Sequence, residues 1–150
     1  MDFVRSGLTV GILTLLWGCA GGEGGGSPHG SEPAPELGTV EAQMDAFNDH
    51  DAPALAAGVT PDFAWFSVRG DSLAVETRGR DAFREGMEAY FASVAGVRSS
   101  IEATVELGRF VALRERVRWE DGSGETRSQA ALGVYEVVDG QIRRVWYFTP

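Results

Sequence analysis

The stretch ALGVYEVVDGQIRRVWYF, residues 131–148, decides the fold because it encodes two strands and the turn that joins them. Val, Ile, Tyr and Trp are frequent on both sides of Asp139-Gly140. An Asp-Gly pair between two runs of this composition is a strong signal for a hairpin with a two-residue loop. The chain therefore ends in a predicted antiparallel strand pair.

The segments before this hairpin predict three helices and a series of further strands. Apolar residues at helical spacing predict a helix over residues 39–51 and another over residues 78–94. Between them, Asp51 as N-cap and Pro53 in the first turn predict a short helix that ends at Gly58. Strands are expected at residues 62–68, 73–77, 97–107, 110–119, 126–138 and 141–148. Helices segregated from long antiparallel strands predict an α+β domain, which we place at residues 38–150.

The composition excludes several classes of function. The chain has 150 residues, enough for one domain, and a net charge of −9. That charge argues against nucleic acid as a partner, because such binding needs a basic surface. The single cysteine cannot form an internal disulfide, and no Cys/His cluster has the spacing of metal ligands. We therefore expect no metal and no cofactor.

Three segments of the chain resemble the SnoaL-like branch of the nuclear transport factor 2-like superfamily. They are AFNDHDAPALAAGVTPDFAWF (46–66), RGRDAFREGMEAYF (78–91) and the closing hairpin (131–148). The resemblance implies a cone in which a curved antiparallel sheet wraps around three N-terminal helices and leaves an apolar cavity at its open end. It also implies a homodimer through the convex sheet face. The fold hosts isomerases, cyclases, dehydratases and non-catalytic binding proteins, so it does not determine the function.

The predicted turn indicates which face of the hairpin lines that cavity. A two-residue loop pairs Glu136 with Arg143, and their opposite charges support this register. One face then carries small, aromatic and hydrogen-bonding side chains, as pocket walls do. Its members are Gln129, Ala131, Gly133, Tyr135, Ile142, Arg144, Trp146 and Phe148. We expect Tyr135 and Arg144 to hold a polar or anionic group of a ligand; the alternative is a structural pair at the rim.

Glu115 is the most unusual residue of the predicted strands. It shares a face with Val111, Leu113, Val117 and Trp119, whereas Arg114, Arg116 and Arg118 occupy the other face. Inside a pocket, burial would raise the pKa of this carboxyl and suit it to acid–base chemistry. The alternatives are a bulge that turns Glu115 outward, or a pair with a neighbouring arginine. Trp65 is a second predicted wall residue, unless it belongs to the core.

The first 37 residues predict export and anchoring to a membrane. Residues 8–17 are apolar but too few to span a bilayer, which is typical of a signal peptide. They lead into Leu16-Trp17-Gly18-Cys19, which resembles the bacterial lipobox, in which the cysteine receives the lipid. We therefore interpret residues 1–18 as a lipoprotein signal peptide, Cys19 as the lipid attachment site and residues 19–37 as a flexible tether. The alternative is an ordinary secretory signal cut near Ala20.

Two functions of different classes follow from this reading. The first is a non-catalytic lipoprotein of the bacterial cell envelope that binds a small hydrophobic or amphipathic molecule. The second is a SnoaL-like enzyme of the isomerase, cyclase or dehydratase type, with Glu115 as acid or base and Tyr135 or Arg144 stabilising an oxyanion. A third option is a protein-interaction domain whose cavity is packed shut. The expected ligand-binding residues are Trp65, Glu115, Gln129, Tyr135, Arg144 and Trp146, and His50 is expected in a solvated loop.

Overall fold

The computed structural model describes residues 35–149, which form three helices and six strands in the expected order. The helices are α1 (Pro35–Asn48), α2 (Ala52–Ala57) and α3 (Arg80–Ser93). The strands are β1 (Val59–Arg69), β2 (Ser72–Arg78), β3 (Arg98–Leu107), β4 (Phe110–Glu120), β5 (Thr126–Val138) and β6 (Gln141–Phe148). Helix α1 begins at Pro35, before the expected domain boundary at residue 38. None of the helices in residues 35–149 combines the length and the apolar character needed to span a membrane.

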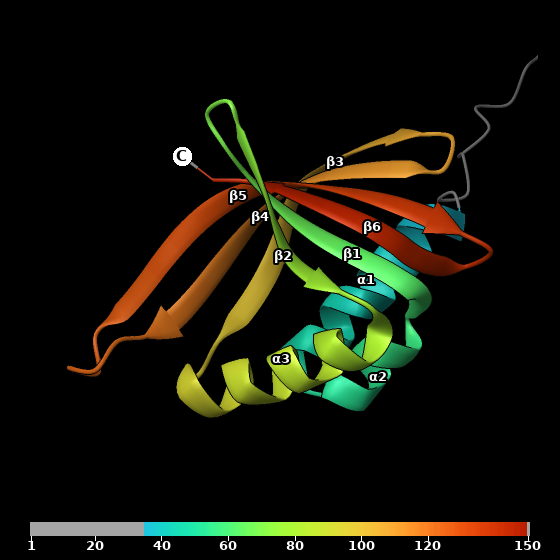
Figure 1. Ribbon diagram of the computed structural model, residues 1–150. Coiled ribbons are helices and arrows are strands. Elements are labelled where there is room, and N and C mark those ends of the chain that lie inside the picture. The colour runs from blue at the N-terminus through green and yellow to red at the C-terminus, as the bar shows by residue number, and fades with distance from the viewer. Residues whose placement is uncertain (1–34, 150) are drawn as a thin grey trace, which may run out of the picture. The chain divides into compact units, whose positions relative to one another are not determined.

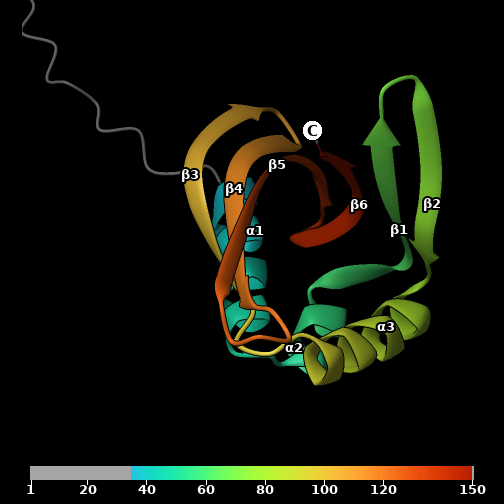
Figure 2. The same ribbon diagram turned by 90° about the vertical axis from the view of Figure 1, so that its left-hand side faces the viewer.

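The six strands form one curved sheet in the order β2-β1-β6-β5-β4-β3. Figures 1 and 2 show this sheet curling around the helices, with α2 and α3 lying across its concave side. The α+β class and the curved sheet are therefore confirmed. The sheet is not antiparallel throughout, because β6 lies parallel to β1 while the other neighbouring pairs are antiparallel. The last strand of the chain, β6, thus lies between β1 and β5 and connects the N-terminal strands to the rest of the sheet.

The helices bury their apolar faces against the concave side of the sheet. Val40 and Met44 are the buried residues of α1, and Phe83 and Met87 are those of α3. Helix α2 starts as expected, because an oxygen of the Asp51 side chain accepts a hydrogen bond of 2.9 Å from the Ala54 backbone N–H. The core formed in this way occupies only part of the concave side, and a cavity lies beside it.

The hairpin turn has the expected geometry, but β6 contains a bulge that changes the register. Asp139 and Gly140 have φ angles of 51° and 74°, as a two-residue loop of type I′ requires. Val137 pairs with Ile142, yet Glu136 pairs with Arg144 rather than with Arg143. The expected Glu136–Arg143 pair is therefore wrong. One extra residue in β6 exchanges the two faces for every later position of the strand.

The residues that the bulge moves outward have partners on the convex side. Glu136 is 2% exposed and lies between two guanidinium groups, with its carboxylate 3.2 Å from Nε of Arg109 and 3.6 Å from Nη1 of Arg144. Trp146 stacks on Phe66 with ring centroids 5.7 Å apart. Arg143 itself pairs with Asp62 at 2.9 Å. The bulge therefore supplies ion pairs and ring stacking outside the cavity.

The end of α1 is fastened to the start of β3. The Asn48 amide donates a hydrogen bond of 2.9 Å to the Ser99 carbonyl and accepts one of 2.7 Å from the Ser99 N–H. His50 is exposed in a turn, as expected; its ring also stacks on Phe91 at 4.7 Å, and its Nε2 donates a hydrogen bond of 2.8 Å to the Val97 carbonyl. The two hydrogen bonds of Asn48 fix the position of Ser99, which belongs to the site described next.

Candidate functional site

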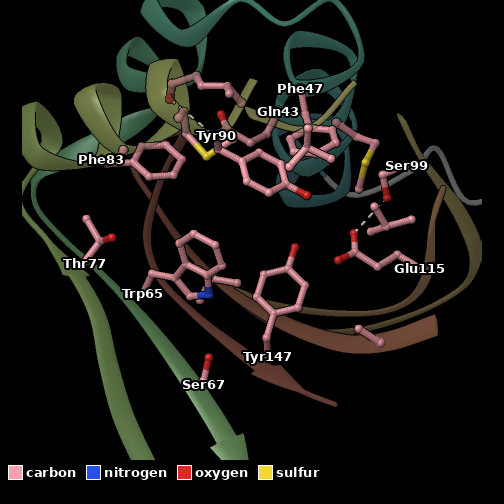
Figure 3. Close-up of a pocket in the computed structure, with 18 of the residues that line it drawn as sticks. Gln43, Phe47, Trp65, Ser67, Thr77, Phe83, Tyr90, Ser99, Glu115 and Tyr147 are labelled. Atoms are coloured by element: carbon pink, nitrogen blue, oxygen red, sulfur yellow. Dashed lines mark hydrogen bonds between the residues drawn. The ribbon is translucent and has the colours of Figure 1, made fainter. Parts of the chain in front are cut away.

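A cavity of about 890 Å³ lies between the concave face of the sheet and the helices. Figure 3 shows Trp65 and Tyr147 extending from the sheet, and Phe83, Tyr90 and Phe47 facing them from the helices. Most of the lining is apolar or aromatic, and its polar side chains include Glu115, Ser99 and Gln43. A cavity of this size and composition is typical of small-molecule sites.

Glu115 lies in the wall of this cavity and is 2% exposed. Strand β4 pairs with β5 without any shift in register, so the alternation along β4 is regular and Glu115 faces inward. The irregularity lies instead in β3, between Ile101 and Ala103. The two alternatives are therefore wrong: no bulge turns Glu115 outward, and the neighbouring Arg114 and Arg116 pair with Glu102 on the other face.

Two hydroxyl groups interact with the Glu115 carboxylate, and a third is linked to it through Tyr147. Ser99 Oγ donates to Oε2 of Glu115 over 3.4 Å, and the Tyr147 hydroxyl also interacts with the carboxylate. The Tyr147 hydroxyl in turn shares a short hydrogen bond with the Tyr135 hydroxyl. Figure 3 shows the Glu115 carboxylate and the Tyr147 hydroxyl directed toward each other. The result is one connected polar cluster on an otherwise apolar wall.

Burial sets the ionisation of this cluster. Desolvation raises the pKa of Glu115 above its ordinary value of 4.5, and hydrogen bonds from Tyr147 and Ser99 partly offset the effect. The pKa values of Tyr135 and Tyr147 are raised, first by desolvation and then by nearby groups, including Glu115. Both tyrosines are therefore neutral hydrogen-bonding groups at physiological pH, and Glu115 is the acidic group of the cluster.

Trp65 contributes a flat apolar wall next to the cluster. Its ring meets that of Tyr147 edge-on, with centroids 5.8 Å apart. Its Nε1 is buried and has no hydrogen-bond partner within residues 35–149. Among the same residues, no three His, Cys, Asp or Glu side chains are grouped so that they could hold a metal ion.

The cavity includes four of the expected residues and excludes two. Trp65, Glu115, Tyr135 and, at the mouth, Gln129 line it. Arg144 and Trp146 do not, because the bulge at Arg143 turns them to the convex face, so assigning these two to the cavity was wrong. Cys19 lies outside the residues that the structure describes.

Tyr147 is the important residue that the sequence reasoning missed. A signal for it was present, because strict alternation from Ile142 places Arg144 in the core, whereas one extra residue places Val145 and Tyr147 there instead. Gly133 pairs with Tyr147 rather than with Trp146 as the expected register implied. A Cβ at Gly133 would lie 2.9 Å from Cε2 of Tyr135 and 3.4 Å from Cε1 of Tyr147. This glycine therefore makes room for the tyrosine pair.

Comparison with known proteins identifies the family. The model of the SnoaL-like domain matches residues 40–145, most of the chain. The protein belongs to the SnoaL-like domain family. No match was found among curated proteins. The expectation drawn from the three sequence segments is therefore confirmed for the family and the fold.

Solved structures share this fold. An uncharacterized cystatin fold protein from Novosphingobium aromaticivorans is 27% identical with a TM-score of 0.65, over 75% of this chain and 96% of that one. An LEH-like epoxide hydrolase from M. tuberculosis is 22% identical with a TM-score of 0.66, over 77% and 83%. TerC, crystallised with polyporic acid, is 21% identical with a TM-score of 0.66, over 78% and 92%. The last two show the fold alone.

The position of Glu115 predicts how stability depends on pH. A carboxyl whose pKa is higher in the folded than in the unfolded state stabilises the fold most below the unfolded pKa, and this contribution is lost as the pH rises through the folded pKa. Glu115→Gln should therefore gain stability relative to the unaltered protein as the pH rises above 4.5. Urea denaturation across a pH series measures this difference. A difference that stays constant with pH would contradict the raised pKa.

Proposed function

We propose that the domain binds a small, mostly apolar molecule in the cavity beside Glu115. The observation that carries this proposal is the open cavity itself: about 890 Å³, with rings from both the sheet and the helices and one polar cluster. Apolar walls supply affinity, and a few placed polar groups orient the ligand. The proposal of a domain with its cavity packed shut does not fit this space. In the SnoaL-like family, binding proteins and enzymes share such a fold.

A neutral fluorescent probe, N-phenyl-1-naphthylamine, tests for an accessible apolar cavity. Ala130 and Ala131 are adjacent on β5 and face opposite sides of the sheet, Ala131 toward the cavity. We expect Ala131→Trp to fill part of the cavity and weaken probe binding by about tenfold or more, equivalent to roughly 1.4 kcal/mol. Ala130→Trp is the matched control and should bind like the unaltered protein. Equal effects of the two substitutions would place the probe elsewhere.

A second function, proton transfer with Glu115 as acid or base, is favoured by the burial of that carboxyl among hydroxyl groups. Tyr147 and Tyr135 would then stabilise an oxyanion as neutral donors, and Arg144, on the convex face, would take no part. The two functions separate at Glu115→Gln once a ligand is known. Turnover that is lost in Glu115→Gln indicates the enzyme, and the absence of turnover in both proteins indicates the binding module.

We further propose that the domain is exported and anchored to a membrane of the bacterial cell envelope through Cys19. The support is the apolar run of residues 8–17, the sequence Leu16-Trp17-Gly18-Cys19, and the Gly- and Pro-rich segment before α1. A lipid at Cys19 would keep the domain at the membrane surface, and residues 20–34 would act as the tether.

Metabolic labelling with palmitate tests the anchor. In a bacterial host, the unaltered protein should incorporate the label and appear in the membrane fraction. Cys19→Ser should lose the label and leave that fraction, because it removes the only thiol in the chain. Cys19→Ser that remains in the membrane fraction would indicate an uncleaved signal segment, and unaltered protein released without label would indicate an ordinary secretory signal.

We also propose a homodimer through the convex face of the sheet. On this face Leu132 is 45% exposed and Phe148 is 39% exposed, and the two are paired across β5 and β6. The stacked rings of Phe66 and Trp146 adjoin them. Exposed apolar residues that lie together on a sheet favour contact with another protein surface, here a second copy.

Sedimentation of the domain without residues 1–34 tests this dimer. We expect a dimer for the unaltered domain and a monomer for Leu132→Glu, because each copy would then have to bury the new carboxylate in an apolar interface. Ala89→Glu is the control, since it adds the same charge at an exposed position of α3, away from the convex face. A monomer at all concentrations of the unaltered domain would refute the proposal.

A further inference from the structure

The domain buries two carboxylates, and they differ in their partners. Glu115 and Glu136 are each 2% exposed. Glu136 lies between Arg109 and Arg144, so its charge is compensated within the protein. Glu115 has only neutral hydroxyl groups around it, and no ion pair in the part of the chain that the structure describes. A buried charge without a counter-charge is costly, so the ionised Glu115 has an unfilled requirement for a cation.

The space in front of Glu115 is built from aromatic rings rather than cations. Tyr147 and Tyr135 lie beside the carboxylate, and Trp65 and Tyr90 line the adjoining wall (Figure 3). Aromatic faces attract organic cations through their quadrupoles, most strongly where water is excluded. A carboxylate together with such faces supplies both the charge and the apolar contact that an alkylated ammonium group needs.

The hydroxyl groups favour the ionised form of Glu115. Ser99 Oγ donates to the carboxylate, and the interaction with Tyr147 also lowers the pKa of Glu115. Donors directed at a carboxylate stabilise its negative charge, and that charge is what a cation recognises. Burial opposes this charge, so a bound cation would supply the stabilisation that the hydroxyl groups alone do not.

The other charged residues that line the cavity also favour a cationic ligand over an anionic one. Its acidic lining residues are Glu115, Glu120 and Asp121, and Asp121 is paired with Arg127. Arg69, near the end of β1, is the one cationic side chain that lines the cavity within residues 35–149. Nothing in this lining offers a buried anion site, whereas Glu115 offers a buried cation site.

We propose that the ligand of this cavity is an organic cation, an amine or quaternary ammonium group joined to an apolar body. The ammonium group lies against Glu115 and the rings of Tyr147 and Tyr135, and the apolar body extends along Trp65 toward α3. This inference rests on the proposed function, since it names the chemical class that the cavity binds.

Three probes of similar size separate charge from shape. Benzyltrimethylammonium is a cation, neopentylbenzene is its neutral isostere, and phenylacetate is an anion. Each is titrated at pH 8 against N-phenyl-1-naphthylamine bound in the cavity. We expect the cation to displace the dye at a concentration at least about tenfold lower than the neutral isostere, and phenylacetate to be the weakest, since close charge complementarity of this kind exceeds about 1.4 kcal/mol.

Glu115→Gln keeps the shape of the side chain and removes its charge. It should weaken benzyltrimethylammonium by about tenfold and change neopentylbenzene by less than about twofold. Glu85→Gln, which removes one negative charge from the exposed side of α3, should leave both unchanged. Backbone amide NMR spectra of the two variants are the control that checks whether each remains folded.

The outcomes separate this inference from the proposed function. Equal displacement by the cation and its isostere, or a preference that survives Glu115→Gln, would refute the cation while leaving a cavity that binds apolar molecules. A protein that binds neither the dye nor any of the three probes would refute the proposed function itself, and the cation with it.

Discussion

The one-residue bulge in β6 is the constraint on which both faces of this sheet depend. It lies beside a tight turn and the Val137–Ile142 pair, and from that point it reverses the direction of every side chain in β6. Val145 and Tyr147 thereby face the cavity, and Arg144 and Trp146 face outward. Without the bulge, Arg144 would lie in the core and Arg143 would take its place opposite Glu136. The bulge therefore completes the polar cluster and lets Arg143 pair with Asp62.

The two faces of the sheet illustrate opposite ways of burying a carboxylate. Glu136 is held between two guanidinium groups, and removing one of them would leave a charge whose desolvation costs on the order of several kcal/mol. Glu115 is held by hydroxyl groups, and burial raises the pKa of its carboxyl, which favours the neutral form more than at an exposed position. The first arrangement is suited to stability, because its charges are already matched. The second is suited to the proposed function, because a ligand beside Glu115 would change the charge state of its carboxyl.

Most of the fold could be predicted from the sequence because its signals are local. The Asp51 cap, the Asp139-Gly140 loop and the alternation in β4 each depend on a few consecutive residues, and each appears in the structure as expected. The register of β6 could not be predicted in the same way. It depends on Arg143 reaching Asp62 in β1 and on Glu136 lying between Arg109 and Arg144, which are contacts between distant segments.

A site residue could be predicted from the sequence only where the register of its strand could be predicted. Glu115 lies in a regular strand, so an anomaly in a simple pattern identified it. Tyr147 lies beyond the bulge, so the same reasoning assigned the wrong aromatic residue, Trp146. The parallel pairing of β1 with β6 was also missed, because nothing within either strand specifies which distant strand lies beside it. Trp65 meets Tyr147 through that pairing, and the aromatic wall is therefore a property of the tertiary structure.

Cation binding and proton transfer place the same demand on Glu115 and differ in what the ligand offers it. Cation binding and proton abstraction by Glu115 as a base both require the ionised carboxylate, which burial disfavours and the hydroxyl groups of Ser99 and Tyr147 support. A fixed positive charge satisfies the carboxylate and lowers its basicity, so such a ligand would be held and left unchanged. A neutral ligand with an acidic C–H bond would instead meet a base whose raised pKa favours taking the proton. Asn48 serves either role, because its two hydrogen bonds fix Ser99 and so the direction from which the carboxylate is hydrogen-bonded. Under the two proposed functions, the charge of the ligand decides whether this site binds or catalyses.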